Sequence, residues 1–324
     1  MHLFKKYRDR IKKEIKMREF LINQDGLQKS AKWQENCWIN IECPDKDDYN
    51  YLINELKVPS YFYSDIADID ERPRMEIEDG WQFVILRIPY KATDLGLPFS
   101  TVPLGVIFND KIMLSICFFK TDLIEDFIEY TRRKNITIDD HFDLLLKLLF
   151  SSSVWFLKYL KQINQKIKTA ENKLDKAITN DDLHALLQIE KCLVYFLTSL
   201  EGNDSLLRRV KNILSKKNQV DIELIEEVEV ELKQALVITN IYSDILSGMM
   251  DAYASVISNN LNLVMKRLTS ISIILMIPTL IASLYGMNVP NSFENNPFGF
   301  WIILFFSFCI SISGVLIFKS RNWL

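Results

Sequence analysis

The amino-acid sequence predicts an α+β cytosolic domain, a long stalk helix and two C-terminal transmembrane α-helices. Three observations lead to this prediction: strand-like segments with turn signals come first, uninterrupted helical patterns follow, and charge is almost absent at the end. The chain has 324 residues, is 48% hydrophobic and 25% charged, and carries a formal net charge of −3. From Leu268 onward the only charged side chains are those of Glu294, Lys319 and Arg321. The average composition of the chain therefore combines a polar part with an apolar part that could lie in a membrane.

Residues 1–136 are expected to form an α/β domain with a small sheet. Its predicted strands are Cys37–Glu42, Met75–Ile77, Trp81–Pro89, Val102–Phe108 and Ile112–Phe119, with a helix from about Asp45 to Leu56. Asp79-Gly80 lies between two of these strands and is typical of a hairpin turn. The basic stretch at residues 1–18 predicts a solvated helix, with contact to anionic lipid or nucleic acid as the alternative. It contains no long apolar run, so we expect no signal peptide.

From about Asp139 the hydrophobic period becomes that of helices. Residues 137–220 predict a helical hairpin, with a first helix of about 35 residues from His141 and a second from Asp181 to about Ser215. Glu201-Gly202-Asn203 could interrupt or bend the second helix. Residues 221–267 predict a stalk helix. Because no stop signal precedes the apolar segment, helix is expected to continue to about Tyr285, over roughly 100 Å.

Two uncharged segments, Leu268–Tyr285 and Phe298–Phe318, are long enough to cross a hydrocarbon core of ~30 Å. We divide this region into a first membrane helix at 268–288, an outer loop at 289–297, a second membrane helix at 298–318 and a basic tail at 319–324. A pair of buried core helices is the alternative. Lys and Arg flank the two segments but are absent from the connecting loop. The positive-inside rule then predicts a multi-pass protein of the cell inner (plasma) membrane with both termini in the cytosol.

The sequence contains no arrangement of residues that predicts catalysis. The five cysteines and three histidines lack metal-ligand spacing, and HExxH, GxSxG, P-loop and GxGxxG motifs are absent. We therefore expect no enzyme and neither a nucleotide nor a nucleic acid as partner. The cysteines are expected to be buried free thiols in a reducing compartment.

One face of the first apolar helix carries a stripe of residues that suggests a path for ions. They recur at steps of 3, 4, 4, 3 and 4 residues and become small and polar toward the outer loop. The stripe consists of Met265, Leu268, Ser272, Met276, Thr279 and Ser283. Either it lines water, in which case several copies of the chain must surround an axis, or it forms a tight dimer seam without conduction.

The stalk helix begins with a run of acids that includes Glu223 and Glu227. Acids in the first turns of a helix often form a solvated face and interact favourably with the helix dipole. The alternative is weak divalent-cation binding by carboxylates of neighbouring subunits.

The end of the first membrane segment, Tyr285-Gly286-Met287-Asn288, resembles the signature of the CorA family of magnesium channels. The resemblance extends upstream through Ser247–Thr269 and includes Trp323-Leu324. It covers the architecture of the whole chain, although specific residue matches concentrate after Ser247. The sequence departs from the family at two points. The outer loop VPNSFENNP lacks the Met-Pro-Glu-Leu run common there, and the helix proline stands in MIPT rather than MPLT.

This resemblance implies a funnel-shaped homopentamer in the lipid bilayer with one pore along its axis. The positions that would line this pore are Asn262, Met265, Leu268, Met276, Thr279, Gly286 and Asn288. Gly286, Met287 and Asn288 would form the ion entrance. Met265, Leu268 and Met276 would form a hydrophobic constriction below it.

The same resemblance implies regulatory metal sites between subunits in the cytosol. Their candidate ligands are Glu227, Asp94, Asp251 and Glu223, and Glu294 is the only acid of the outer loop that would attract cations. Mg2+ is the expected transported and regulatory ion, with Co2+, Ni2+ or Zn2+ as further candidates. Two alternatives remain open: a Zn2+, Co2+ or Ni2+ transporter of the same fold, and a membrane-tethered scaffold without transport.

Overall fold

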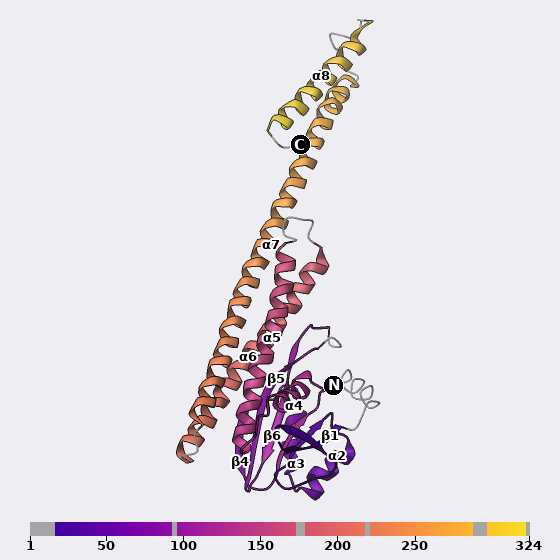
Figure 1. Cartoon of the computed structure of the whole chain (residues 1–324). Helices are drawn as coiled ribbons and strands as arrows, with labels where there is room; N and C mark the ends of the chain where they lie inside the picture. The colour runs from indigo at the N-terminus through magenta and orange to yellow at the C-terminus, as the bar shows by residue number, and fades with distance from the viewer. Residues whose placement is uncertain (1–16, 93–95, 173–178, 218–220, 288–296, 322–324) are drawn as a thin grey trace. The chain divides into compact units, whose positions relative to one another are not determined.

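The computed structural model describes residues 17–92, 96–172, 179–217, 221–287 and 297–321 of the chain (Figure 1). These residues fall into two compact units, one that ends at Ser247 and one that begins at Gly248. The boundary lies inside a single long helix.

A mixed sheet with seven strands forms the base of the N-terminal unit, in the order β2-β1-β3-β7-β6-β5-β4. Its strands are β1 (Met17–Asn23), β2 (Leu27–Ser30), β3 (Trp38–Glu42), β4 (Arg74–Glu78), β5 (Trp81–Tyr90), β6 (Ser100–Phe108) and β7 (Met113–Cys117). Only β3 and β7 pair in parallel, and the other neighbours are antiparallel. The predicted hairpins β4–β5 and β6–β7 are therefore confirmed. β1 and β2 were not predicted, and the helix expected over residues 1–18 is wrong for Met17 and Arg18, which belong to β1.

Both faces of the central strands of this sheet are buried, while the edge strands β2 and β4 have exposed residues. Side chains alternate along β5, so that Phe83 and Ile85 belong to the core on one face, while Val84 and Leu86 are fully buried on the other. The first face is covered by the π-helical turn η1 (Tyr51–Glu55), which follows α2 (Lys46–Asn50), and by α3 (Ser60–Ala67). Phe62 of α3 stacks on Phe83 with ring centroids 4.2 Å apart.

The other face carries the long helices α5 (His141–Glu171) and α6 (Asn180–Lys217), which both contact β5 (Figure 1). The shorter helix α4 (Asp122–Lys134) contacts β2, β5 and α5. Helix α6 continues through Glu201-Gly202-Asn203, so the interruption considered from the sequence does not occur. Packing explains the glycine instead, because a Cβ added to Gly202 would lie 2.7 Å from Cγ of Pro73.

The helix α7 (Ile222–Tyr285) has 64 residues and contains Pro278 without ending there. At a rise of ~1.5 Å per residue its length is about 96 Å, as the missing stop signals predicted. In the N-terminal unit one of its faces is buried, with Ile225, Val228 and Leu232 in the core. Within the C-terminal unit it is followed by α8 (Gly299–Ser320).

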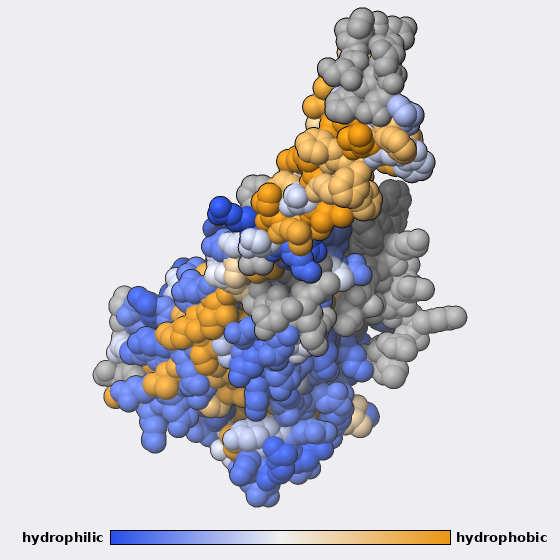
Figure 2. Space-filling view, turned by 90° about the horizontal axis from the view of Figure 1, so that it is seen from above, coloured by the Kyte–Doolittle hydropathy of each residue, from blue (hydrophilic) through white to orange (hydrophobic). Residues whose placement is uncertain are grey.

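Three helices are long and apolar enough to cross a membrane among the residues that the structure describes: α6 over Asn180–Ser215, α7 and α8. In α6 39% of the apolar window is buried inside the protein, whereas in α7 and α8 only 6% is. The apolar surface of α6 is thus used for packing, while that of α7 and α8 needs an apolar environment. Figure 2 shows the contrast: the C-terminal unit presents a dense hydrophobic surface, and the N-terminal unit is mostly hydrophilic.

Candidate functional site

The stripe predicted from the sequence lies on one exposed face of α7. Asn262, Met265, Leu268, Ser272, Met276, Thr279 and Ser283 are all exposed in the single chain. In contrast, Ser270 is buried, and Ile274, Ile277 and Ile281 are partly buried. Because each residue turns a helix by about 100°, positions 270, 274, 277 and 281 lie on the side opposite the stripe.

The covered side of α7 faces α8. A Cβ added to Gly314 of α8 would lie 3.7 Å from Cγ1 of Ile274. Nearer the loop, Ile281 lines an apolar cavity together with Ile302, Ile303 and Phe306 of α8. The second membrane helix therefore leaves the stripe uncovered, which the spacing of the stripe residues alone could not reveal.

The hydroxyl groups of the stripe present oxygen acceptors to that open side. Ser272 Oγ donates to the carbonyl of Leu268 at 2.9 Å, and Thr279 Oγ1 donates to that of Leu275 at 2.7 Å. Each hydroxyl proton is thus used within the helix, and the oxygen lone pairs remain available to a hydrated cation or to water. The carbonyl of Ile274 gains no backbone partner from Pro278, which has no N–H group.

The predicted ion entrance begins where α7 ends. The N–H of Gly286 donates to the carbonyl of Ala282 at 2.9 Å, which completes the last turn. Met287 follows with its side chain 56% exposed. The third member of the predicted entrance, Asn288, and the loop acid Glu294 lie outside the described residues, as does Asp94 of the predicted regulatory site.

The predicted regulatory acids that the structure describes, Glu223, Glu227 and Asp251, do not form a shared metal site within one chain. Glu223 and Glu227 belong to the N-terminal unit and Asp251 belongs to the C-terminal unit, and all three side chains are exposed on α7. Among the described residues, no three His, Cys, Asp or Glu side chains are placed to hold a metal ion together. Their neighbour Glu229 is already paired, with Lys211 at 3.0 Å and Lys233 at 3.1 Å, and these bonds lower its pKa.

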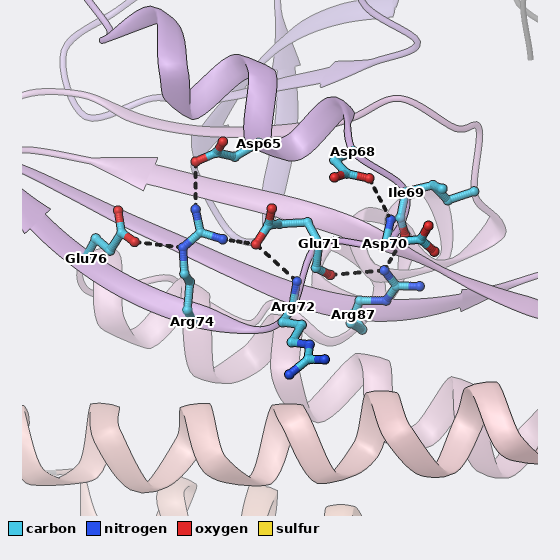
Figure 3. A network of polar contacts seen from close by, with 9 residues as sticks. All are labelled: Asp65, Asp68, Ile69, Asp70, Glu71, Arg72, Arg74, Glu76 and Arg87. Atoms are coloured by element: carbon cyan, nitrogen blue, oxygen red, sulfur yellow. Dashed lines mark hydrogen bonds and ion pairs between the residues drawn. The ribbon is translucent and has the colours of Figure 1, made fainter. Parts of the chain in front are cut away.

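A polar network that was not predicted ties an acidic segment to the sheet (Figure 3). Arg74 pairs with Asp65 at 2.6 Å, with Glu76 at 2.7 Å and with Glu71. Partial burial opposes the charge of Arg74, but the bonds to these carboxylates outweigh it and raise the pKa of the guanidinium. The alternating charges of Asp68–Glu76 were the available sequence signal for this network.

Arg87 of β5 extends this network toward the helices. Its guanidinium donates to the carbonyls of Ile69 and Glu71, and to the carbonyl and hydroxyl of Thr101 at 2.9 and 2.8 Å. The Thr101 hydroxyl in turn lies 2.8 Å from Ser199 Oγ of α6. Burial lowers the pKa of Arg87 although Asp70 and Asp68 lie nearby. The acidic segment is therefore joined to α6 through buried hydrogen bonds.

Comparison with known proteins gives a consistent result. A family model described as "CorA-like Mg2+ transporter protein" matches residues 33–320. The chain is similar to the cobalt/magnesium transport protein CorA of Methanocaldococcus jannaschii, with 25% identity over 292 residues that cover 89% of this chain and 91% of the relative. It is also similar to the cobalt/magnesium transport protein CorA of Thermotoga maritima, with 27% identity over 300 residues that cover 89% and 83% of the two chains.

One solved structure is similar over nearly the full length of both chains. It is the complete structure of the CorA magnesium transporter from Methanocaldococcus jannaschii, with a TM-score of 0.79 and 22% identity. The similarity covers 96% of this chain and 100% of that one. At this identity the similarity establishes a shared fold.

Proposed function

The chain belongs to the CorA-like Mg2+ transporter family, and from this premise we propose that it conducts Mg2+ passively into the cytosol through a pore lined by α7. The observation that carries the proposal is the position of the stripe on the side of α7 opposite α8. In a membrane helix, small and hydroxyl residues that are not packed against the neighbouring helix of the same chain either meet another copy or line water. The proposal assigns the stripe to water.

Several copies of the chain are needed to enclose this pore. A second observation supports an assembly: the cytosolic part of α7 exposes an apolar row at Val230, Val237, Ile241 and Ile245, each at least 47% exposed. These residues are separated by steps of 7, 4 and 4 and therefore share a face. Such a row in water favours contact with further copies of the same helix. We propose the homopentamer that the family resemblance implies.

The proposed selectivity rests on oxygen dipoles without a fixed charge. Mg2+ loses its water reluctantly and prefers octahedral oxygen ligands. A ring of Asn288 amides and backbone carbonyls, which follows Gly286 and Met287, suits an ion that keeps much of its water. Glu294 would raise the cation concentration near this ring.

Below the entrance, the same face of α7 becomes apolar. Met276, Leu268 and Met265 are 69%, 56% and 52% exposed in the single chain. Brought together around an axis, such side chains close a path by excluding water. We propose that this constriction is the gate.

Gating would follow the cytosolic Mg2+ concentration. Mg2+ that bridges Glu227, with Glu223, Asp251 and Asp94 as further candidate ligands, would hold neighbouring stalks together and keep the gate closed. When Mg2+ falls, the carboxylates repel each other and the constriction becomes hydrated. With both termini in the cytosol of an inner (plasma) membrane protein, the potential, negative inside, would drive uptake by about 2.3 kcal/mol per charge and 100 mV, without ATP.

Two other functions are separable from this one by experiment. A Zn2+, Co2+ or Ni2+ transporter would share the fold and the pore and differ in cargo. A membrane-tethered scaffold would conduct nothing. The intact Met287 of the signature favours Mg2+ over Zn2+, Co2+ or Ni2+ as the transported ion. The uncovered hydroxyl stripe favours transport over a role as a scaffold.

The test is ion flux into liposomes that contain the purified full-length protein and a metal-sensitive dye. We expect Mg2+ influx that increases with an inside-negative potential and that is lost in Asn288→Ala. Asn295→Ala, in the same loop, is the matched control and should keep its flux. Absence of Mg2+ influx in the wild type contradicts the proposal. Influx of Zn2+, Co2+ or Ni2+ without influx of Mg2+ would support a transporter of the same fold for those ions.

A further inference from the structure

The N-terminal unit contains a cavity of about 360 Å3 between α4 and α5, far from the membrane segments in sequence. Two lysines and four carboxylates line it: Lys91 and Lys158 against Asp122, Glu125, Asp126 and Glu129. All four carboxylates come from α4. The lining therefore has a net charge of −2 (two positive and four negative groups), which favours a cationic ligand.

Two lysine ammonium groups of the protein already contact the residues that line the cavity. Lys91 Nζ lies 3.2 Å from Asp122 Oδ2. Lys158 Nζ lies 3.6 Å from the centroid of the Trp155 ring, a cation–π contact. Trp155 is itself held in place, since its Nε1 donates to Asp126 Oδ2 at 3.0 Å. One ammonium thus rests on a carboxylate and the other on an aromatic ring.

Tyr159 presents a polar atom to the cavity that nothing else in the described chain satisfies. Its side chain is only 1% exposed, stacks on Phe99 at 4.6 Å and meets Trp155 edge-on at 5.3 Å. Among the residues that the structure describes, its hydroxyl has no hydrogen-bond partner. Burial and the nearby charge of Asp122 raise its pKa, so it remains a neutral phenol whose oxygen can accept a hydrogen bond.

Two carboxylates on the rim of the cavity have no ion-pair partner among the described residues. Glu125 and Glu129 are exposed, lie one turn apart on α4, and take part in no ion pair among the described residues. Like charges at this spacing repel each other, so a cation between them is stabilising. From Asp122 to Glu129 the row of carboxylates extends about 10 Å along the helix.

We propose that this cavity binds a linear aliphatic polyamine. Its ammonium groups are separated by short hydrocarbon chains, as the carboxylates of α4 are separated by helical turns of ~5.4 Å. One terminal ammonium donates to the hydroxyl of the buried Tyr159 side chain, the next groups donate to Glu125 and Glu129, and the methylene groups pass Trp155. A bare metal ion fits less well, because no three of these carboxylates, or of any others in the described ranges, converge on one point.

The probe is spermidine, added to the detergent-solubilised full-length protein and measured by equilibrium dialysis at constant ionic strength. We expect saturable binding of one spermidine per chain. The charge-neutral double variant Glu125→Gln/Glu129→Gln should weaken it about tenfold. Tyr159→Phe keeps the ring but removes the hydroxyl, and should weaken binding by a smaller factor. Glu190→Gln/Glu201→Gln removes the same charge from exposed positions of α6 and should leave binding unchanged.

Three results would overturn the assignment. The first is no saturable binding in the wild type. The second is an equal loss in both double variants, which would show only general attraction to an acidic protein. The third is loss of spermidine on addition of millimolar MgCl2 but not of NaCl at the same ionic strength, which would make the cavity a site for hydrated divalent cations.

Discussion

Arg87 of β5 and Asn203 of α6 form a reciprocal pair of hydrogen bonds across 116 positions of the chain. The N–H of Arg87 donates to Asn203 Oδ1 at 2.9 Å, and Asn203 Nδ2 donates to the carbonyl of Arg87 at 2.8 Å. The pairing of β4 with β5 ends at Arg74↔Ile85, two residues before Arg87. The side-chain amide of Asn203 therefore replaces the strand that is missing at this point and fastens α6 to the sheet edge.

Replacing Asn203 with alanine should destabilise the N-terminal unit by about 2–4 kcal/mol. The backbone N–H of Arg87 would lose its hydrogen-bond acceptor, and the carbonyl of Arg87 would lose one of its donors. The measurement is the thermal unfolding midpoint of the solubilised protein. Asn240→Ala is the control, since the Asn240 amide makes only an exposed bond to the carbonyl of Leu236. An equal fall in both variants would contradict this role of Asn203.

Alanine should have opposite effects at two glycines of the long helices. In Gly202→Ala the new Cβ would lie 2.7 Å from Cγ of Pro73, so α6 must move from the sheet and stability should fall. In Gly248→Ala no atom lies within 4 Å of the new Cβ, and the better helix propensity of alanine should add up to about 1 kcal/mol. Unfolding midpoints that shift in the same direction would contradict the packing described for Gly202.

Glu42 should make stability depend on pH. Burial raises its pKa from 4.5 to about 6, although Thr121 donates to it from its N–H at 3.1 Å and its hydroxyl at 3.3 Å. The folded state thus binds a proton more tightly than the unfolded state. The stabilisation from this group is complete below pH 4.5 and is lost as the pH rises to about 6, a change of about 2 kcal/mol.

Glu42→Gln imitates the protonated side chain and removes this dependence. Relative to the wild type, the variant should therefore gain stability as the pH rises from 4.5 to 7. Glu55→Gln, at an exposed position, serves as the control. If the difference in free energy of unfolding between the wild type and Glu42→Gln is the same at both pH values, Glu42 is not the source of the pH dependence.

Met276→Asn should increase Mg2+ flux in liposomes. It places a polar group at the most exposed apolar position of the proposed gate, where Met276 is 69% exposed, and hydrates the constriction. Ile271→Asn makes a comparable change on another face of α7, about 140° around the helix from Met276, where Ile271 is 46% exposed, and should not increase flux. An increase in both variants would argue for a general leak rather than a gate.

The order of strands and helices was largely predictable from local signals. Alternating apolar residues and the Asp79-Gly80 turn predicted β4 and β5, and the unbroken helical period predicted α7. Strands β1 and β2 were not predictable from charge, because the many lysines and arginines of residues 1–18 favour a solvated helix. Asp25-Gly26, where both residues have positive φ, was the hairpin signal that could have revealed them.

The candidate site was predictable as a pattern but not as a surface. The spacing of Met265 to Ser283 placed these residues on one face, while the packing of Ile274 and Ile281 against α8 had to come from the tertiary structure. The Arg87 network depends on Asn203, which is far away in the chain, so no local pattern specified this partner, whereas the carboxylates around Arg74 all lie within nine residues of it. The roles of the stripe, of Asn288 and of the regulatory acids stay predictions.

The most direct test of an ion path along α7 is Mg2+ flux before and after a positively charged thiol reagent. The background is Cys309→Ser, because Cys309 is an exposed thiol in α8. Thr279→Cys adds a thiol on the stripe, and Ile277→Cys adds one on the side that faces α8. The account predicts that the reagent blocks flux through the Thr279→Cys protein and leaves the Ile277→Cys protein active. Flux that is blocked only in Ile277→Cys, or in neither protein, would contradict a pore lined by this stripe.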